Sequence, residues 1–220
     1  MKTHPLMPAG LKILVRRHWS GRVAALVLTT AIASLFTIAQ PGYLVPVAFS
    51  VPVAWADARS DLAAVEAKVA AEFPALNHMQ PDALAVMISS GQPVLIFDVR
   101  EESEYAVSHL AGATRVAPNS DPAAFAASIA ASAKGKAVVF YCSVGMRSSR
   151  LASKAAPHLM QGGAASVNNL RGGIFRWSNE GRPLEKGAAT PGKASNSGVT
   201  VHPYNASWGK LIEEPKAAAH

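Results

Sequence analysis

A single cysteine is the residue of this sequence best suited to covalent chemistry. Cys142 directly follows the apolar run AVVFY, residues 137–141, which is typical of a buried strand. After it come Ser143, Val144, Gly145, Met146, Arg147 and Ser148. A side chain at the carboxyl end of a parallel strand lies where open α/β sheets place their functional sites. Free N–H groups at the start of a following helix favour an anion, so we predict a reactive thiolate.

Two residues of this loop strengthen the prediction. Gly145 allows the backbone to curl with its N–H groups pointing inward, as in an anion-binding nest. Arg147 adds a fixed positive charge. The competing interpretation is a buried free cysteine that packs as a small apolar side chain. The order strand, Cys, Gly, Arg and helix favours the reactive thiol.

Alternating short apolar runs and helical patterns must hold this loop in place. Strands are predicted at residues 94–99, 113–117, 137–141 and 165–170. Helices are predicted at residues 61–73, 101–110, 122–134, 147–156 and 173–181. Pro74 should end the first helix, Asp121 should cap the third, and Pro157 should bend or end the fourth. The predicted fold class is therefore α/β, a mostly parallel central sheet flanked by helices.

The chain divides into four predicted parts. These are a signal peptide or membrane anchor at 1–56, a helical spacer at 57–75, the α/β domain at 76–186 and a C-terminal tail at 187–220. The tail is rich in Gly, Ala, Ser and Pro up to about residue 198. It ends in VHPYNASWGKLI, which has too many aromatic residues for a simple linker. A protein partner could bind there, around Tyr204 and Trp208.

The net charge of +7 belongs chiefly to the N-terminus. Five basic residues and no acid lie in the first 22 positions, which leaves +2 for the rest of the chain. A body so weakly charged lacks the electrostatic footprint of a nucleic-acid-binding protein. A positive segment before an apolar run, residues 23–39, is typical of an export signal instead.

Two interpretations of the export segment stay open. Ala54-Trp55-Ala56 matches the pattern that signal peptidases cleave, which would release a soluble periplasmic protein that begins near Asp57. The apolar run at 23–39 reaches the lower length limit for spanning a bilayer, which indicates an uncleaved anchor in the inner membrane. Both interpretations place the body in the periplasm.

Cysteine and histidine usage argues against a metal centre. One cysteine excludes an intramolecular disulfide and a zinc site built on paired cysteines. The seven histidines are scattered and form no known ligand motif. We therefore predict no metal and no other cofactor.

Four segments of the chain resemble the rhodanese family of sulfurtransferases. They are VLIFDVREESEY at 94–105, SHLAGATRV at 108–116, VVFYCSVGMRSSR at 138–150 and NNLRGGIFRWSNEGRPL at 168–184. In this order they span nearly the whole predicted domain. The resemblance implies a rhodanese-like fold and a single-domain sulfurtransferase of the exported bacterial type.

The resemblance also implies a mechanism. Cys142 would take a sulfur atom from a small donor, become a persulfide, and pass the sulfur to a thiol or cyanide. Backbone N–H groups of residues 143–147 would cradle the thiolate and the persulfide. Asp98 and Arg100 match the family's Asp-x-Arg pair and are expected to form an ion pair beside the loop. Other residues of the matched segments are expected to serve structure rather than catalysis: His109, Phe175 and Trp177.

Loop length and one acidic residue bear on the substrate. Related dual-specificity phosphatases and arsenate reductases have a loop one residue longer, sized for a phosphate-like oxyanion. Four residues lie between Cys142 and Arg147, so a sulfur atom should fit better than a phosphoryl group. Glu104 precedes Tyr105 where thiosulfate-using members can present an arginine. An acid there would repel an anionic donor, which makes a persulfide or polysulfide a rival to thiosulfate.

Two functions without catalysis stay open on the same fold. The domain could be a persulfide carrier or thiol sensor that binds a partner through the Cys142 loop. It could also be an interaction module whose tail docks a protein. Slow turnover with a readily formed persulfide would indicate the carrier.

Overall fold

The computed structural model of this chain describes residues 53–187 and 199–213. The predicted export segment, including the apolar run at 23–39, therefore lies almost wholly outside the described residues. Within the two described ranges, no helix is both long and apolar enough to cross a membrane.

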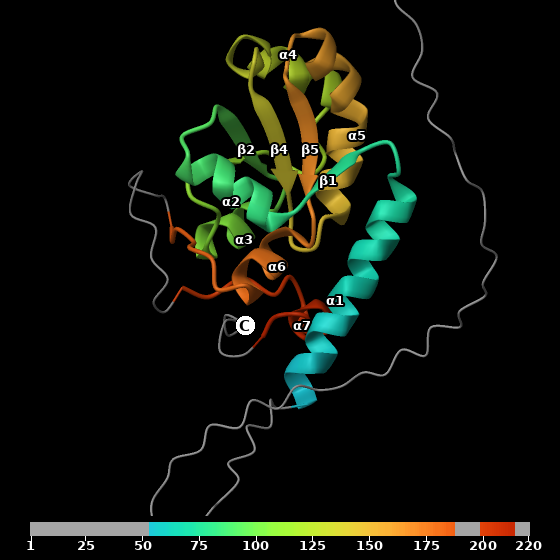
Figure 1. The fold of residues 1–220 in the computed structure, drawn as a ribbon, viewed down its shortest axis with the longest axis vertical. Coiled ribbons are helices and arrows are strands. Elements are labelled where there is room, and N and C mark those ends of the chain that lie inside the picture. Colours follow the sequence, from blue (N-terminus) through green and yellow to red (C-terminus); the bar gives the residue numbers. More distant parts are fainter. Residues whose placement is uncertain (1–52, 188–198, 214–220) are drawn as a thin grey trace, which may run out of the picture. The chain divides into compact units, whose positions relative to one another are not determined.

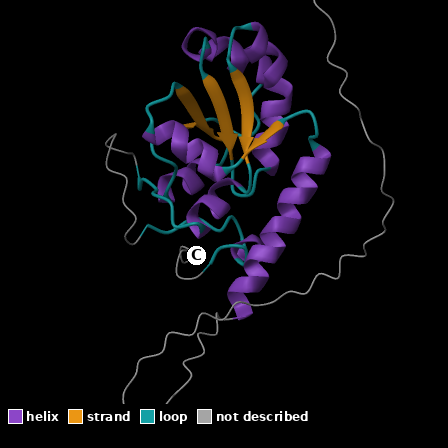
Figure 2. Cartoon of the chain, viewed as in Figure 1, coloured by secondary structure: helices purple, strands orange, loops and turns teal. Residues whose placement is uncertain are grey.

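A five-stranded parallel sheet forms the centre of the fold. Its strands are β1 (Asn77–Met79), β2 (Val94–Asp98), β3 (Thr114–Arg115), β4 (Ala137–Tyr141) and β5 (Ser166–Leu170). They run in the order β1-β5-β4-β2-β3, and every pairing is parallel. Figure 1 and Figure 2 show the strands between layers of helices. The predicted α/β class with a parallel sheet is confirmed.

Alternation along β4 divides the core between the two faces of the sheet. Val139 and Tyr141 point to one face, while Val138 and Phe140 point to the other. β4 is the middle strand of the sheet, and helices cover both of its faces. All five of its residues, which lead directly to Cys142, are therefore buried.

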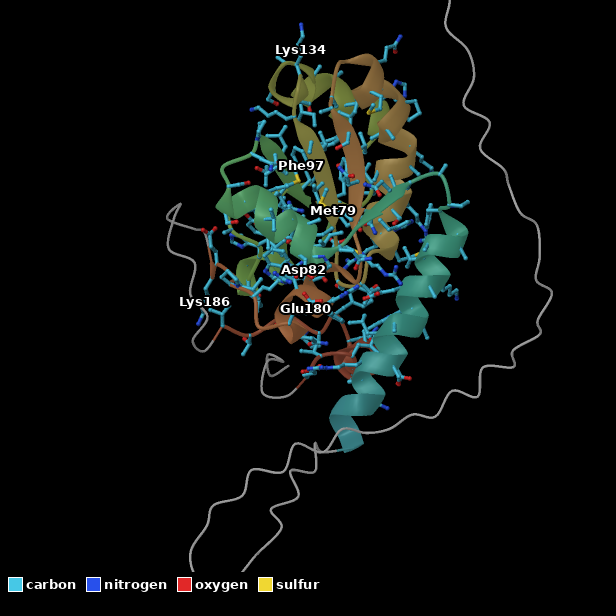
Figure 3. All side chains as sticks on the ribbon, viewed as in Figure 1. Met79, Asp82, Phe97, Lys134, Glu180 and Lys186 are labelled. Atoms are coloured by element: carbon cyan, nitrogen blue, oxygen red, sulfur yellow. The ribbon has the colours of Figure 1, made fainter. Side chains whose placement is uncertain are left out.

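Different helices cover the two faces. The face of Tyr141 packs against buried residues of α1 (Val53–Glu72), α2 (Pro81–Ser89) and α6 (Gly173–Asn179). The face of Phe140 packs against α4 (Pro122–Ala133) and α5 (Met146–Gln161). The short helices α3 (Glu102–Val107) and α7 (Ala206–Gly209) complete the fold. Figure 3 shows the side chains that fill both layers.

Two helices follow the predicted bounds closely, α4 and α6, whereas the helix predicted at 101–110 ends at Val107. The Asp121 side chain accepts a hydrogen bond from Ala124 N at 2.7 Å and caps α4 as predicted. Of the two alternatives predicted for Pro157, the end of the helix is wrong, because α5 continues to Gln161. Buried Leu159 lies beyond the proline and packs on the same face as Leu151. Packing of this face outweighs the hydrogen bond that proline removes.

The helix predicted at residues 61–73 begins earlier and packs on the body. As α1 it runs from Val53 to Glu72, and buried Leu62 joins the core on the Tyr141 face. Buried Glu66 accepts hydrogen bonds from Arg171 Nε at 2.8 Å and from Arg176 Nη1 at 3.1 Å. These contacts fix α1 to α6 and to the segment that leads into it.

Residues 199–213, called the strap below, pack against the same body. Val201, Leu211 and Ile212 are buried. The Ser108 hydroxyl donates to the Thr200 carbonyl at 2.7 Å. At the other end of the strap, the Asn179 side chain donates to the Leu211 carbonyl at 2.8 Å. The strap, red in Figure 1, therefore lies across the end of the molecule that carries α6.

Candidate active site

Cys142 occupies the turn between β4 and α5. The thiol is buried, with 1% of the residue exposed. The Gly145 N–H donates to Cys142 Sγ at 3.2 Å, as the predicted cradle requires. Gly145 is the N-cap residue of α5, and its φ of 101° lies in the left-handed region that favours glycine. The loop therefore brings Sγ to the electropositive end of a sixteen-residue helix.

The start of α6 fixes the orientation of the loop peptides. Ile174 N donates to the Cys142 carbonyl at 2.9 Å, and Phe175 N donates to the Ser143 carbonyl at 3.0 Å. A trans peptide places its N–H opposite its C=O. The N–H groups of Ser143 and Val144 therefore point away from α6. This is the arrangement in which successive N–H groups can face an anion.

β5 supports the first turn of α5. The Ser148 hydroxyl donates to Asn169 Oδ1 at 2.6 Å, and both residues are buried. A Cβ on Gly145 would lie 3.0 Å from Asn169 Nδ2, so the loop passes close to this side chain. Ser148 was predicted to belong to the binding loop, but its hydroxyl bonds Asn169 and it does not line the pocket described next.

A pocket of about 170 Å³ opens above the thiol. Five of its lining residues come from the predicted loop and two from the strap: Cys142, Ser143, Val144, Met146, Arg147, Tyr204 and Trp208. The two aromatic residues were singled out in the tail, but the sequence did not predict that they face Cys142. The sequence signal that could have indicated a role for them is the presence of two large aromatic side chains in a tail rich in small and polar residues.

Arg147 is paired with Glu104 at the edge of the pocket. Nη1 and Nη2 of Arg147 donate to the two carboxylate oxygens at 2.7 and 2.8 Å. The Ser143 hydroxyl accepts from Arg147 Nη2 at 3.0 Å and donates to Glu104 Oε1 at 3.1 Å. Glu104 is buried and does not line the pocket. Glu104 therefore affects an anionic donor only indirectly, because it pairs with Arg147, the cation that such a donor would bind.

Both members of this pair are held in their charged forms. Burial alone would raise the pKa of Glu104, but hydrogen bonds from Arg147 and from the Glu101 N–H lower it below its ordinary value. Burial alone would lower the pKa of Arg147, but its hydrogen bonds to Glu104 and the nearby negative charges raise it. The pair therefore stays ionised at neutral pH.

Tyr204 covers the guanidinium of Arg147. The Arg147 Cζ atom lies 4.8 Å from the centroid of the Tyr204 ring, within the range of a cation–π contact. Tyr204 has a φ of 66°, which is rare for a bulky residue, and its side chain is half-exposed. Trp208 is partly buried against the core. These two rings line the pocket together with the loop residues.

Asp98 and Arg100 form the predicted ion pair behind the loop. Arg100 Nε and Nη2 donate to the Asp98 carboxylate at 2.8 and 2.6 Å, with both side chains fully buried. The Tyr141 hydroxyl also donates to Asp98, at 2.6 Å. Arg100 Nη2 donates further to the Ser108 carbonyl at 2.6 Å. Neither Asp98 nor Arg100 lines the pocket, so the pair braces the segments around it.

The residues expected to be structural lie within the fold. His109 is buried, stacks on Tyr105 with ring centroids 3.8 Å apart, and shares a hydrogen bond between Nδ1 and the Tyr105 carbonyl at 3.0 Å. Phe175 and Trp177 are buried in the core of the Tyr141 face. Among the described residues, no three His, Cys, Asp or Glu side chains could together hold a metal ion.

Comparisons with known proteins agree with this geometry. The family described as the rhodanese-like domain matches residues 80–180. A sulfurtransferase of Allochromatium vinosum is 30% identical over 109 residues, which cover 50% of this chain and 94% of that protein. The matched residues include the Cys142 loop and α6. They end before the strap that supplies two lining residues of the pocket.

Solved structures show more distant likenesses. The BH2092 protein of Bacillus halodurans is 24% identical with a TM-score of 0.41, covering 55% of this chain and 85% of that chain. The thiosulfate sulfurtransferase of Pseudomonas aeruginosa is 21% identical with a TM-score of 0.46, covering 63% of this chain and 25% of that chain.

Proposed function

Because this chain belongs to the rhodanese-like family, we propose that it is a sulfurtransferase that carries sulfane sulfur as a persulfide on Cys142. The observation that carries the proposal is the 3.2 Å hydrogen bond from Gly145 N–H to Cys142 Sγ, at the helix N-terminus and the floor of a pocket. A small sulfur compound is the donor, and a thiol or cyanide is the acceptor.

The proposed reaction has two transfers. The Cys142 thiolate attacks the outer sulfur of the donor, a new sulfur–sulfur bond forms, and the donor's bond to that sulfur breaks. The remainder of the donor leaves with the electron pair, as sulfite from thiosulfate or as a thiolate from a persulfide. An acceptor thiolate or cyanide then attacks the outer sulfur of the Cys142 persulfide and releases the thiolate, which completes a ping-pong cycle.

The loop supports both anionic states of the cysteine. The Gly145 N–H already donates to Sγ. The N–H groups of Ser143 and Val144 point away from α6, because α6 donates hydrogen bonds to the carbonyl groups of the same two peptides. Fixed N–H dipoles stabilise a thiolate or persulfide without reorganisation during the reaction. The short spacing between Cys142 and Arg147 favours a sulfur atom over a phosphoryl group.

Intact mass after incubation with a donor tests the proposal. The full chain is exposed separately to thiosulfate and to polysulfide, and the expected result is a gain of about 32 Da, one sulfur atom. The matched control is Cys142→Ser, which keeps the side-chain size and must gain nothing. No adduct on the wild type, with a free thiol still titratable, would overturn the sulfurtransferase proposal.

Transfer to an acceptor separates an enzyme from a carrier. After excess donor is removed, addition of cyanide should return the mass to its starting value and release one thiocyanate per Cys142. With donor and cyanide both in excess, thiocyanate should accumulate over repeated cycles. A readily formed persulfide with only slow turnover to cyanide and added thiols would indicate the persulfide carrier or thiol sensor instead.

We also propose that the protein is exported to the periplasm. The support is the positive segment and apolar run in residues 1–56, which lie mostly outside the described residues. Cleavage after Ala56 would fall within the first turn of α1. Cell fractionation with N-terminal mass analysis distinguishes a cleaved soluble form from an anchored one, and a full-length cytoplasmic form would contradict export.

A further inference from the structure

The pocket above the thiol is mainly apolar. Val144, Met146, Tyr204 and Trp208 supply most of its wall. Among the residues that the structure describes, Arg147 is the only charged one that lines it. Its volume of about 170 Å³ is close to that of an engineered apolar cavity, about 150 Å³, that binds benzene. A small organic group therefore fits beside Sγ.

The positive charge of Arg147 is already matched. Its two terminal nitrogens donate to both oxygens of Glu104, and the Tyr204 ring covers the face of its guanidinium. With the Cys142 thiolate, these charged groups carry one net negative charge. A dianion such as thiosulfate therefore meets a site without surplus positive charge, and must give up its hydration to enter it.

The strap holds its two aromatic residues in defined positions. Tyr204 N donates to His202 Nδ1 at 2.9 Å, which supports the left-handed backbone at Tyr204. Asn205 Oδ1 accepts from Trp208 N at 3.0 Å and caps the short helix that carries the tryptophan. A rare backbone conformation that is braced in this way, next to a reactive thiol, indicates a functional position for the side chain.

We infer that Tyr204 and Trp208 form a binding subsite for the apolar group of an organic persulfide, and that thiosulfate is the poorer donor. This inference rests on the proposed transfer through Cys142 and adds the chemistry of the donor. Tyr204 and Trp208 are specificity-determining residues in this scheme.

The donor reaction balances without any further reactant. For a persulfide R–S–SH, the Cys142 thiolate forms a bond to the outer sulfur, and the bond between the two donor sulfurs breaks. The thiolate R–S⁻ leaves with the electron pair, and the transferred sulfur keeps its proton or releases it to water. The group R lies against Tyr204 and Trp208 while the outer sulfur lies at Sγ.

Three stable donors that differ in charge and size test the inference. Thiosulfate is a dianion, whereas methanethiosulfonate and benzenethiosulfonate are monoanions, and the last carries a ring. All three give up an outer sulfur, and the two thiosulfonates release a sulfinate. With cyanide as acceptor, we expect kcat/KM of the full chain to be about tenfold higher for benzenethiosulfonate than for methanethiosulfonate, and lowest for thiosulfate. Equal values for the two thiosulfonates would overturn the inference.

A variant of Tyr204 locates the preference in the strap. Tyr204→Asn removes the ring, and asparagine tolerates the left-handed backbone. The ratio of kcat/KM between the two thiosulfonates should fall about tenfold. The matched control is Val86→Asn, which removes an apolar side chain that is 59% exposed on α2 and outside the pocket, and which should leave the ratio unchanged. An unchanged ratio in Tyr204→Asn would overturn the inference.

Trp208 gives an independent second variant. Since Trp208 also packs on the core, Trp208→Leu keeps an apolar contact there while it removes the ring. The same fall in the ratio is expected, with the thermal midpoint showing that the strap stays folded. If none of the three donors adds sulfur to Cys142, the proposed function fails. If all three act equally well, the proposed function stands and only the subsite inference fails.

Discussion

The Cys142 carbonyl lies against the backbone of Gly173, so closely that a Cβ on this glycine would be 2.2 Å from the oxygen. The approach allows α6 to donate hydrogen bonds to two successive carbonyls of the loop. Gly173 also has a φ of 56°, in the left-handed region. A glycine at the first position of α6 is thus a requirement of the cysteine loop, although it lies on another βα unit.

Replacement of Gly173 by alanine should both destabilise the fold and impair persulfide formation. The new Cβ meets backbone atoms that cannot move aside, so a loss of about 3 kcal/mol in the free energy of unfolding is expected. Gly91→Ala is the control, because its φ is 66° but nothing lies within 4 Å of a Cβ there. That variant should lose only about 1 kcal/mol. Urea unfolding measures the free energy of unfolding of both variants. Equal losses in the two variants would contradict the close approach of Gly173 to the loop as the cause.

Neutralising Glu104 should improve the use of thiosulfate. Glu104→Gln keeps the shape of the side chain but leaves the charge of Arg147 unmatched beside the pocket. We expect the KM for thiosulfate to fall several-fold, since an anionic donor then finds a free cation. Glu102→Gln is the control on the same helix, because the Glu102 side chain is 87% exposed and lies away from the pocket. A KM that is unchanged or raised in Glu104→Gln would show that Arg147 does not limit anion binding.

The same glutamate should make stability depend on acid pH. The pKa of Glu104 in the folded protein is lowered from its ordinary value of 4.5, although burial opposes this, because Arg147 and the Glu101 N–H bind the carboxylate. The group therefore contributes stability above about pH 4.5, and this contribution is lost as the pH falls through the folded pKa. The stability gap between wild type and Glu104→Gln should shrink between about pH 6 and pH 3 in urea unfolding. A gap that does not change with pH would contradict the ionised pair.

Local sequence patterns were sufficient for the centre of the fold and for the position of Cys142 between β4 and α5. The apolar runs at β2 and β4 identify buried parallel strands, and Asp121 caps its helix as its position predicts. β1 was missed because its residues, Asn-His-Met, form no apolar run. It becomes a strand only because β5 offers an unpaired edge.

Contacts between distant segments could not be predicted in the same way. Glu104 and Arg147 lie 43 positions apart in the sequence, and their pairing depends on how α3 packs beside the cysteine loop. Tyr204 and Trp208 belong to a segment separated from the domain by a Gly/Ala/Ser-rich stretch, with no pattern that shows where it folds back. The predicted site thus included Cys142 and its loop but not Tyr204 and Trp208, which make the pocket mainly apolar.

Removal of the Tyr141 hydroxyl should weaken the scaffold without changing the chemistry. This hydroxyl donates to Asp98 Oδ2 at 2.6 Å and accepts from the buried Leu110 N–H at 3.1 Å. Tyr141→Phe leaves that N–H without an acceptor and the Asp98 carboxylate with one donor fewer, so a loss of about 1–3 kcal/mol is expected.

Tyr105→Phe is the matched control for this prediction. Its hydroxyl donates only to the Ala113 carbonyl at 2.7 Å, and the ring is half-buried, so water can replace the lost bond and the cost should be smaller. Urea unfolding gives both stabilities, and intact mass after donor treatment gives the persulfide yield. The yield should match the wild type in both variants, because neither hydroxyl reaches the pocket. If Tyr141→Phe kept its stability but lost the persulfide, Asp98 and its partners would have to act on the thiol directly rather than brace the segments around it.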